Sequence, residues 1–553
     1  MQTLLTSALV AAAALAAPRP PNIVLLFVDD LGYGDLGFTG HPSTLTPALD
    51  ELAAGGMRLT SWYTAYPVCS ASRAALLTGR QPPRVGMPGV INSLSAGGLP
   101  LNETTIADHL RAGGYKTLAI GKWHQGQQPQ YLPRERGFDR FLGLPFSVDD
   151  GEGFASNCTP PAGAAAASVS AGGGVAVGSS AFTAPPRAPP AAVQRVGLGP
   201  SLPLPSIRQD NGSSVIVAQP TDLVPLTEQW WNFTRQFLRD LAAEPLFAYV
   251  AFGHVHTATP NVPGRQYAGC AFQGTTARGA FGDALAEVDW FAAQLLAELR
   301  ALALEENTLL LFVSDNGPSL RWGLSAGSVG PFVGAAAAFE NGTGYTNTGK
   351  GSTWEGGIRM PAFAYWKGRV APGSHSGEVV STMDVLPAAL KLAGLPPKRG
   401  VVDGRASLAD ILLGRGGSAH AFLPFYNGYY GNVSTEMYAA RAGRYKAHWI
   451  TGPGLGGGRW PTDAHAAAEL WRHDPPLLFD VQADPSEMFP LAPDQLPPTL
   501  LAELHDAKAA ADEGMTLRAI TADFGFEWAL CCGVGCAAPC DNCTCANVPL
   551  PLP

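Results

Sequence analysis

Four apolar runs in the first two-thirds of the chain predict buried β-strands. Each run is continuous rather than alternating, and β-branched and aromatic residues are common in them, as in strands that are buried on both faces. The runs are Asn22 to Val28, Thr117 to Ile120, Leu246 to Phe252 and Leu309 to Ser314. Helical patterns lie between them, at Pro47 to Ala54, Ile106 to Ala112 and Asp283 to Leu302. This alternation predicts an α/β fold with a mostly parallel sheet that helices cover on both faces.

The pattern changes after about residue 397. Short strands follow, such as Met437 to Ala440 and Tyr445 to Ile450, with a Gly-rich hairpin loop at 451–460, and these predict a small antiparallel sheet. Residues 160–205 are a mixture of Ala, Gly, Ser and Pro without periodicity, which predicts a disordered insertion. We therefore expect an N-terminal domain at 18–396, a smaller α+β domain at 397–528 and a cysteine-rich tail at 529–553.

The first 17 residues form a short apolar run that ends in small residues. The run is too short to span a membrane, and we interpret it as a signal peptide. A buried terminal segment is the alternative. No later segment resembles a membrane span. Seven asparagines stand in glycosylation sequons, which also indicates the secretory pathway; they are Asn102, Asn157, Asn211, Asn232, Asn341, Asn432 and Asn542.

Six of the nine cysteines lie in the tail, at Cys531, Cys532, Cys536, Cys540, Cys543 and Cys545. With Cys69 set aside, Cys158 and Cys270 bring the remaining number to an even eight. In an oxidising compartment this predicts disulfides in the tail, whose connectivity the sequence does not give. A zinc knuckle is the rival interpretation, although the tail contains no histidine.

The charge of the chain argues against one class of partner. The formal net charge is -9 and the pI is about 5.7. No basic stripe of the kind that neutralises a phosphate backbone is present. We therefore expect no nucleic-acid partner.

Polar residues follow each of the predicted strands directly. In an open α/β sheet, ligands bind beyond the carboxyl ends of the strands, so residues that are distant in sequence can meet there. This position holds Asp29 and Asp30, Lys122 and His124, His254 and His256, and Asp315 and Asn316.

The chemistry of these residues is coherent. The carboxylate and amide oxygens of Asp29, Asp30, Asp315 and Asn316 are hard ligands that suit calcium or magnesium rather than zinc, although one such pair alone is more often a solvated turn. The histidines His124 and His256 are candidate general acids or bases. We assign His254 a structural role, because His256 follows it on the same side of an extended chain.

Cationic side chains complete the candidate site. Lys122 and Lys350 are suited to an anionic substrate, and Arg73 is placed to hold a nucleophile. The nucleophile is then suggested by the segment that contains Arg73, which runs Cys69-Ser70-Ala71-Ser72-Arg73 and continues AALLTGR. A buried cysteine at the start of a helix is the alternative interpretation of Cys69.

This segment resembles the sulfatase signature C-x-[PA]-S-R-x-x-L-L-T-G. The resemblance covers nearly the whole mature chain and is to the arylsulfatase A branch of the family. The stretches that carry it are NIVLLFVDDLGYGDLG, GYKTLAIGKWH, RGFDRFLGLPFSVDD, DNGP, GKGSTWEGGIRMPA, YAARAGRYKAH, LFDVQADPSE and the cysteine-rich tail. Convergence does not explain a resemblance of this breadth.

The chain departs from the family pattern in two places. The insertion stands where relatives carry a disulfide-bridged loop, and only Cys158 remains near it, so its pairing is open. The segment GHVHTATP is closer to the HVHTA of steroid-sulfatase-like members, so substrate preference is open as well.

The resemblance implies an alkaline-phosphatase-like fold and a mechanism. Cys69 would be oxidised to Cα-formylglycine by the formylglycine-generating enzyme, and calcium, or magnesium in its place, would be bound by Asp29, Asp30, Asp315, Asn316 and the residue formed from Cys69. Lys122, Lys350 and His256 would offset the charge of the sulfuryl group. Ser147 would hydrogen-bond near the substrate.

The resemblance also implies the order of proton transfers. One hydroxyl of the aldehyde hydrate, held by Arg73 and deprotonated with help from Asp315, would attack sulfur, while His256 would protonate the leaving oxygen. His124 would then take the proton from the other hydroxyl, and sulfate would be expelled.

Two rival functions fit the same residues. One is a phosphodiester or phosphonate monoester hydrolase of the same superfamily, and the other is an inactive, calcium-stabilised secreted glycoprotein. The sequence leaves open whether the natural substrate is a sulfolipid, a sulfated glycan or an aryl sulfate. It also leaves open a homo-oligomer and the choice between lysosomal and extracellular destinations. We expect no stable membrane insertion.

Overall fold

The computed structural model describes most of the 553-residue chain. The described residues are 19–87, 89–158, 202–334, 348–417, 420–427, 436–452, 470–516, 518, 530 and 548–549. The proposed signal peptide, the loop at 453–460 and all six tail cysteines lie outside them.

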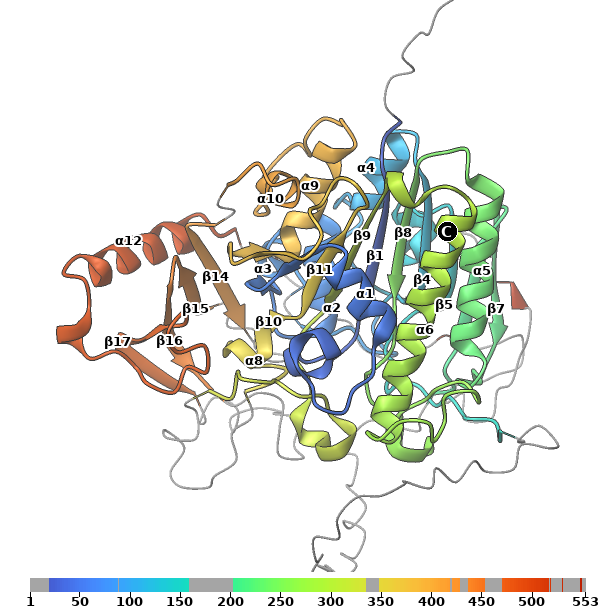
Figure 1. Cartoon of the computed structure of the whole chain (residues 1–553), viewed down its shortest axis with the longest axis horizontal. Coiled ribbons are helices and arrows are strands. Elements are labelled where there is room, and N and C mark those ends of the chain that lie inside the picture. Colours follow the sequence, from blue (N-terminus) through green and yellow to red (C-terminus); the bar gives the residue numbers. More distant parts are fainter. Residues whose placement is uncertain are drawn as a thin grey trace, which may run out of the picture.

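A large mixed sheet forms the centre of the molecule (Figure 1). Its order is β12 (Ser374–Ser376), β2 (Met57–Leu59), β11 (Ala362–Tyr365), β9 (Thr308–Ser314), β1 (Asn22–Val28), β8 (Leu246–Ala251), β4 (Lys116–Lys122), β5 (Arg140–Leu144), β6 (Ser206–Asp210), β7 (Ser213–Ala218) and β18 (Val548–Pro549).

The strands β9, β1, β8, β4 and β5 are parallel to one another. The prediction of an α/β fold with a mostly parallel central sheet is confirmed for this block. On its flanks β11 and β6 pair antiparallel, a feature that the apolar runs did not indicate, because β11 is only four residues long and β6 carries polar residues.

Alternate residues of β1 enter two separate hydrophobic cores. Val24 and Leu26 pack with α1 (Pro47–Ala54), α5 (Leu226–Leu241) and α6 (Ala280–Ala301). Ile23 and Leu25 pack on the other face with α2 (Cys69–Thr78), α4 (Ile106–Ala112), α9 (Val385–Leu392) and α10 (Ser407–Leu412). Both faces of the sheet are therefore buried, which explains why the central strands read as continuous apolar runs.

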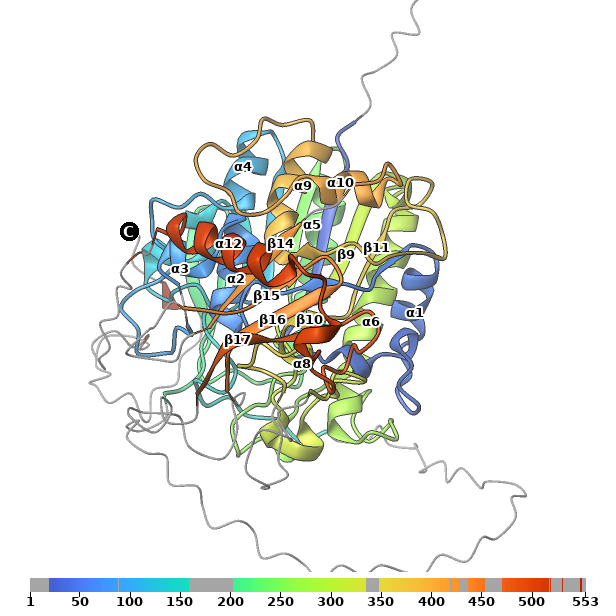
Figure 2. The same ribbon diagram turned by 90° about the vertical axis from the view of Figure 1, so that its left-hand side faces the viewer.

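A smaller sheet lies beside the large one (Figure 1). It is antiparallel, in the order β14 (Phe422–Asn427), β15 (Glu436–Ala442), β16 (Tyr445–Thr451) and β17 (Trp471–Asp480). Figure 2 shows α12 (Leu500–Glu513) lying across this sheet. The predicted C-terminal antiparallel sheet is confirmed.

Several short elements complete the fold. They are the strands β3 (Trp62–Tyr63), β10 (Arg359–Met360) and β13 (Val380–Ser381), which form a three-stranded sheet, and the helices α3 (Pro82–Val85) and α8 (Glu355–Ile358).

One predicted boundary needs correction. Most of the expected insertion at 160–205 lies outside the described residues, but its last four residues do not. Leu202 and Leu204 are buried, and Leu204 accepts a backbone hydrogen bond from Thr221. These leucines are apolar anchors within a low-complexity stretch, so composition alone placed the end of the insertion too late.

The surface features agree with the sequon pattern. The four sequon asparagines in the described part of the chain, Asn102, Asn157, Asn211 and Asn232, are all exposed. Among the described helices, none is both long enough and apolar enough to cross a membrane.

Candidate active site

The parallel strands bring the predicted polar residues to one edge of the sheet. Val28 of β1 pairs with Ser314 of β9, and Phe27 pairs with Ala251 of β8. Because these strands end level with one another, the residues that follow them meet. The backbone N–H of Asp29 donates to the carbonyl of His254 at 2.7 Å, and the N–H of Asp315 donates to Val28 at 2.9 Å.

Helix α2 presents Cys69 to this edge. The helix begins at Cys69, directly after extended Val68, and every residue of it is buried. The thiol, one oxygen of Asp29 and one of Asp315 all lie within 4.8 Å of one another. Cys69 therefore stands beside two carboxylates at the positive end of a helix.

Arg73 lies one helical turn after Cys69 and is fully buried. Its Nε and Nη2 both donate to Oδ2 of Asp315, at 3.0 and 2.8 Å, and its Nη1 donates to the carbonyl of Lys122 at 3.1 Å. The guanidinium thus fixes α2 against two strand ends, a geometry that a lysine does not provide.

Two buried lysines pair with the first two acids. Lys122 Nζ lies 2.6 Å from Oδ2 of Asp29 and donates to Oγ of Ser147 at 3.0 Å. Lys350 Nζ lies 2.6 Å from Oδ1 of Asp30. Both ammonium groups remain charged, because the neighbouring carboxylates raise their pKa values despite burial.

The acids respond differently to burial. Burial and the charge of Asp29 raise the pKa of Asp315 to about 7, against the opposing effect of Arg73. Burial also raises the pKa of Asp29, but Lys122, His256 and Arg73 outweigh it and hold that pKa well below its usual range. Within this cluster Asp315 is the carboxyl group best placed to hold a proton.

Three buried oxygens at this edge have no hydrogen-bond donor among the residues that the structure describes: Oδ1 of Asp29, Oδ2 of Asp30 and Oδ1 of Asn316. The amide of Asn316 donates instead to Oδ1 of Asp30 at 2.7 Å, which turns its own oxygen away from that bond. Unpartnered buried acceptors are costly in a folded protein. A cation with hard oxygen ligands fits these atoms.

The histidines flank the acids. His256 Nε2 lies 3.5 Å from Oδ2 of Asp30. Burial, with Lys122 and Arg73, lowers the pKa of His124 well below its usual range, so its ring is neutral. Both Asp30 and His124 adopt a positive φ of 56°, a conformation that residues other than glycine rarely take and that is common at functional sites.

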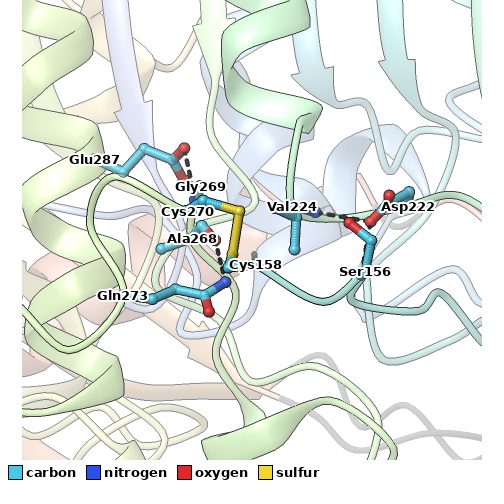
Figure 3. The surroundings of a disulfide bond; sticks show 9 residues. All are labelled: Ser156, Cys158, Asp222, Val224, Ala268, Gly269, Cys270, Gln273 and Glu287. Carbon is cyan, nitrogen blue, oxygen red and sulfur yellow. Dashed lines mark hydrogen bonds between the residues drawn. A yellow bond between two sulfur atoms is a disulfide. The ribbon is translucent and has the colours of Figure 1, made fainter. Parts of the chain in front are cut away.

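His254 makes buried contacts next to the site. Its Nε2 lies 3.0 Å from Oε2 of buried Glu287, and the other oxygen of Glu287 accepts the backbone N–H of Gly269 at 3.0 Å. The next residue, Cys270, forms a disulfide with Cys158 (Figure 3). The partner of Cys158 is thus found, and His254 has the buried surroundings that we expect of a structural histidine.

The structure therefore gathers every predicted site residue at one edge of the sheet. Two family models match the chain: "Sulfatase" over residues 21–395 and "C-terminal region of aryl-sulfatase" over residues 418–545. Arylsulfatase A of Homo sapiens is 38% identical over 97% of both chains.

The chain belongs to the sulfatase family.

Other sulfatases resemble it over most of their length. Steryl-sulfatase of Mus musculus is 36% identical over 87% of this chain and 80% of its own. The crystal structure of PsFucS1 sulfatase from Pseudoalteromonas sp. is 25% identical, with a TM-score of 0.70 over 92% of both chains. The predicted resemblance to sulfatases of the arylsulfatase A branch is confirmed, as is the prediction that the chain is an enzyme that hydrolyses sulfate esters.

The sequence did not single out two acids of this sulfatase. Asp149 Oδ1 lies 3.7 Å from Nδ1 of His256, and Asp150 Oδ2 lies 3.7 Å from Nε2 of His124. Both follow β5, a short strand that the apolar pattern did not reveal. Had 140–144 been recognised as a fifth parallel strand, the same strand-end argument would have found them.

Proposed function

We propose that this sulfatase cleaves sulfate esters with a Cα-formylglycine formed from Cys69 and a calcium ion held by Asp29, Asp30, Asp315 and Asn316. The observation that supports it best is the joint position of Cys69, two buried lysines and the unpartnered oxygens at one edge of the sheet. Such a site is suited to an anionic ester and to a hard cation.

Unmodified Cys69 is a poor nucleophile in these surroundings. Burial, with Asp29 and Asp315, raises the pKa of its thiol to about 11, against the opposing effect of Lys122 and Lys350. Reactive cysteines have lowered pKa values, since the thiolate is the nucleophile. This favours a modified residue at position 69; formylglycine, once hydrated, would supply the attacking hydroxyl.

The donor set favours calcium among the divalent metals. It consists of oxygens alone, which suits calcium or magnesium better than zinc. When bound, the ion would polarise a sulfate oxygen and neutralise charge. Magnesium is the alternative occupant.

The remaining side chains bind the substrate and transfer protons. Lys122 and Lys350 bind the sulfate oxygens, and Ser147 orients Lys122 through its 3.0 Å hydrogen bond. Arg73 holds Asp315, which would accept a proton from the attacking hydroxyl. His256 delivers a proton to the leaving oxygen.

His124 acts in the second half of the reaction. Its ring is neutral, and within the described part of the chain its Nδ1 has no hydrogen-bond partner, so it can accept a proton. We assign it the removal of the proton from the second hydroxyl, which allows sulfate to leave.

We also propose that the protein acts in the secretory pathway, in a lysosome or outside the cell. The exposed sequons and the Cys158–Cys270 disulfide support this location. Its expected partners are the formylglycine-generating enzyme during maturation and a sulfolipid, sulfated glycan or aryl sulfate as substrate.

The experiment that tests the function uses protein produced in a secretory host. Mass spectrometry of the peptide around Cys69 should show a loss of about 18 Da, the change from thiol to aldehyde. Turnover of an aryl sulfate should exceed that of the matching aryl phosphodiester, and a chelator should abolish it until calcium is restored.

Two results would count against the proposal. Faster phosphodiester turnover would favour the rival hydrolase. An unmodified thiol in a protein without turnover would favour the inactive, calcium-stabilised glycoprotein.

A further inference from the structure

Solvent exposure shows on which side the site opens. The side chains of Asp29, Arg73, Lys122 and Asp315 have no exposed area. By contrast, Asp149 is 28% exposed and Asp150 is 24% exposed. The sulfate group binds among the buried cations, so the leaving group must point outward past these two acids.

The two acids also lie beside the groups that handle protons. Asp149 approaches His256 and Asp150 approaches His124, each at 3.7 Å. The backbone N–H of Asp150 donates to the carbonyl of Ser147 at 3.0 Å, and this turn ties the acids to the residue that orients Lys122. These two approaches and the Ser147–Asp150 turn therefore place the acids at the opening.

The opening is acidic, whereas the floor is cationic. Within the described part of the chain, neither Asp149 nor Asp150 forms an ion pair with a lysine or arginine, and Oδ2 of Asp150 is buried without a hydrogen-bond partner. The floor, in contrast, pairs Arg73, Lys122 and Lys350 with Asp315, Asp29 and Asp30, and the cation of the proposed function would leave it net positive. A ligand that fills the site would thus meet positive charge at the sulfate end and negative charge at the other.

The pKa values of the pair indicate that one of the two carboxyl groups is ionised. Burial raises the pKa of Asp149, but His256, a hydrogen bond from Ser147 and Lys122 outweigh it and lower that pKa. Burial and the charge of Asp149 raise the pKa of Asp150 well above its usual range. Asp149 is the ionised member of the pair.

We propose that Asp149 and Asp150 determine leaving-group specificity: they favour sulfate esters whose leaving group is neutral or cationic and reject those with a second anion near the ester. The inference rests on the proposed function, since it places the sulfate at the cationic floor. Like charges brought together in a partly desolvated opening repel each other, and salt screens the exposed part of that repulsion.

The test compares two aryl sulfates of matched shape. One carries a carboxylate and the other a carboxamide, each attached through a methylene group so that the two phenols are similarly acidic. The ratio of their kcat/KM values cancels any general change in the chemical step. For the wild-type enzyme we expect a preference for the carboxamide of about tenfold or more, which corresponds to about 1.4 kcal/mol, and a smaller preference at high salt.

Variants then assign the preference to the two acids. Asp149→Asn and the double variant with Asp150→Asn should bring the ratio towards one, even if both substrates react more slowly. Asp240→Asn is the matched control, because Asp240 is an acid on α5 that pairs with Arg140 at 2.9 Å and is 42% exposed. Its ratio should equal that of the wild type.

The outcomes separate the inference from the proposed function. A wild-type ratio near one, or a ratio that the double variant leaves unchanged, overturns the role of Asp149 and Asp150 while turnover itself supports the sulfatase site. No turnover of either ester by protein with modified Cys69 overturns the proposed function instead.

Discussion

Asn427 of the smaller sheet holds the loop that carries Lys350. Its side-chain amide donates to the carbonyl of Gly351 at 2.9 Å, and the N–H of Gly351 donates to Pro67 at 2.8 Å. Pro67 lies two residues before Cys69. The C-terminal sheet therefore takes part in positioning both Lys350 and the start of α2.

We expect Asn427→Ala to lower kcat/KM for an aryl sulfate about tenfold, because a small displacement of a charge-stabilising group is costly in catalysis. The loss of the bond to Gly351 should lower the free energy of unfolding by about 1 kcal/mol. Steady-state kinetics and urea unfolding measure the two effects.

Asn307→Ala is the matched control, since Asn307 makes the same kind of bond to the carbonyl of Pro20 at 3.0 Å at an exposed position. It should leave kcat/KM unchanged. Equal kinetics for both variants would show that the Asn427 bond does not position the loop.

A buried ionic network joins the smaller sheet to the large domain. Lys446 Nζ of β16 lies 2.8 Å from Oε1 of Glu355 on α8 and 3.0 Å from Oε1 of Glu487, and all three are buried. Glu355 also accepts a hydrogen bond from Tyr63 at 2.8 Å. The network spans segments that lie far apart in the chain.

Lys446→Met should therefore destabilise the protein strongly. Removal of one partner leaves buried charge uncompensated, which costs about 3 to 5 kcal/mol. Chemical denaturation measures the change. Lys508→Met, which breaks the exposed pair with Asp512, should cost less than about 1 kcal/mol, and equal losses for both variants would contradict the importance of the network.

The same network predicts a pH dependence of stability. Burial raises the pKa of Glu355, but Lys446, Arg359 and Arg441 outweigh it and lower that pKa to about 2. An unfolded glutamate titrates near 4.3. Because the folded-state pKa is the lower one, the contribution is complete above about pH 4.3 and is lost as the pH falls towards 2.

Urea unfolding between pH 6 and pH 3 tests this dependence. Glu355→Gln should be less stable than the wild type at pH 6, and the difference should shrink as the pH falls. Glu306→Gln, at a side chain that is 81% exposed, should follow the wild-type curve. A constant difference for Glu355→Gln would contradict the assigned pKa shift.

The sequence predicted the parts of the site that stand at the ends of apolar strands. The bounds of β1, α1 and α4 agree with their predicted ranges, because burial on both faces and helical periodicity are local signals. The residues that follow β1, β4, β8 and β9 meet because those strands are parallel neighbours. For these residues, the position of polar side chains directly after the apolar runs was sufficient to predict that they meet.

The remaining parts depend on contacts that have no local signal. Strand β5 is five residues long and contains Gly143, so no long apolar run marked it. Lys446 and Glu355 are 91 residues apart, and charged pairs of this kind leave no periodic pattern. Lys350 lies on a loop rather than at a strand end, and the family resemblance, more than its position, assigned its role.

The proposed formylglycine at position 69 leads to the last prediction, which concerns Cys69→Ser. Serine at this position has one hydroxyl, whereas a hydrated aldehyde has two. If serine accepts a sulfuryl group, it has no second hydroxyl from which His124 can remove a proton to expel sulfate. We therefore expect at most one turnover per enzyme molecule, and intact-mass measurement after incubation with substrate should show either no adduct or a single sulfuryl group.

Cys69→Ala provides the control, since it lacks any hydroxyl and should remain without an adduct under the same conditions. Both variants should keep the fold, because position 69 begins a helix whose residues are otherwise unchanged. Continued multiple turnover by Cys69→Ser would show that elimination from a second hydroxyl is not needed. The aldehyde would then have no chemical purpose in this enzyme, and the role of His124 as the base of the second step would be lost with it.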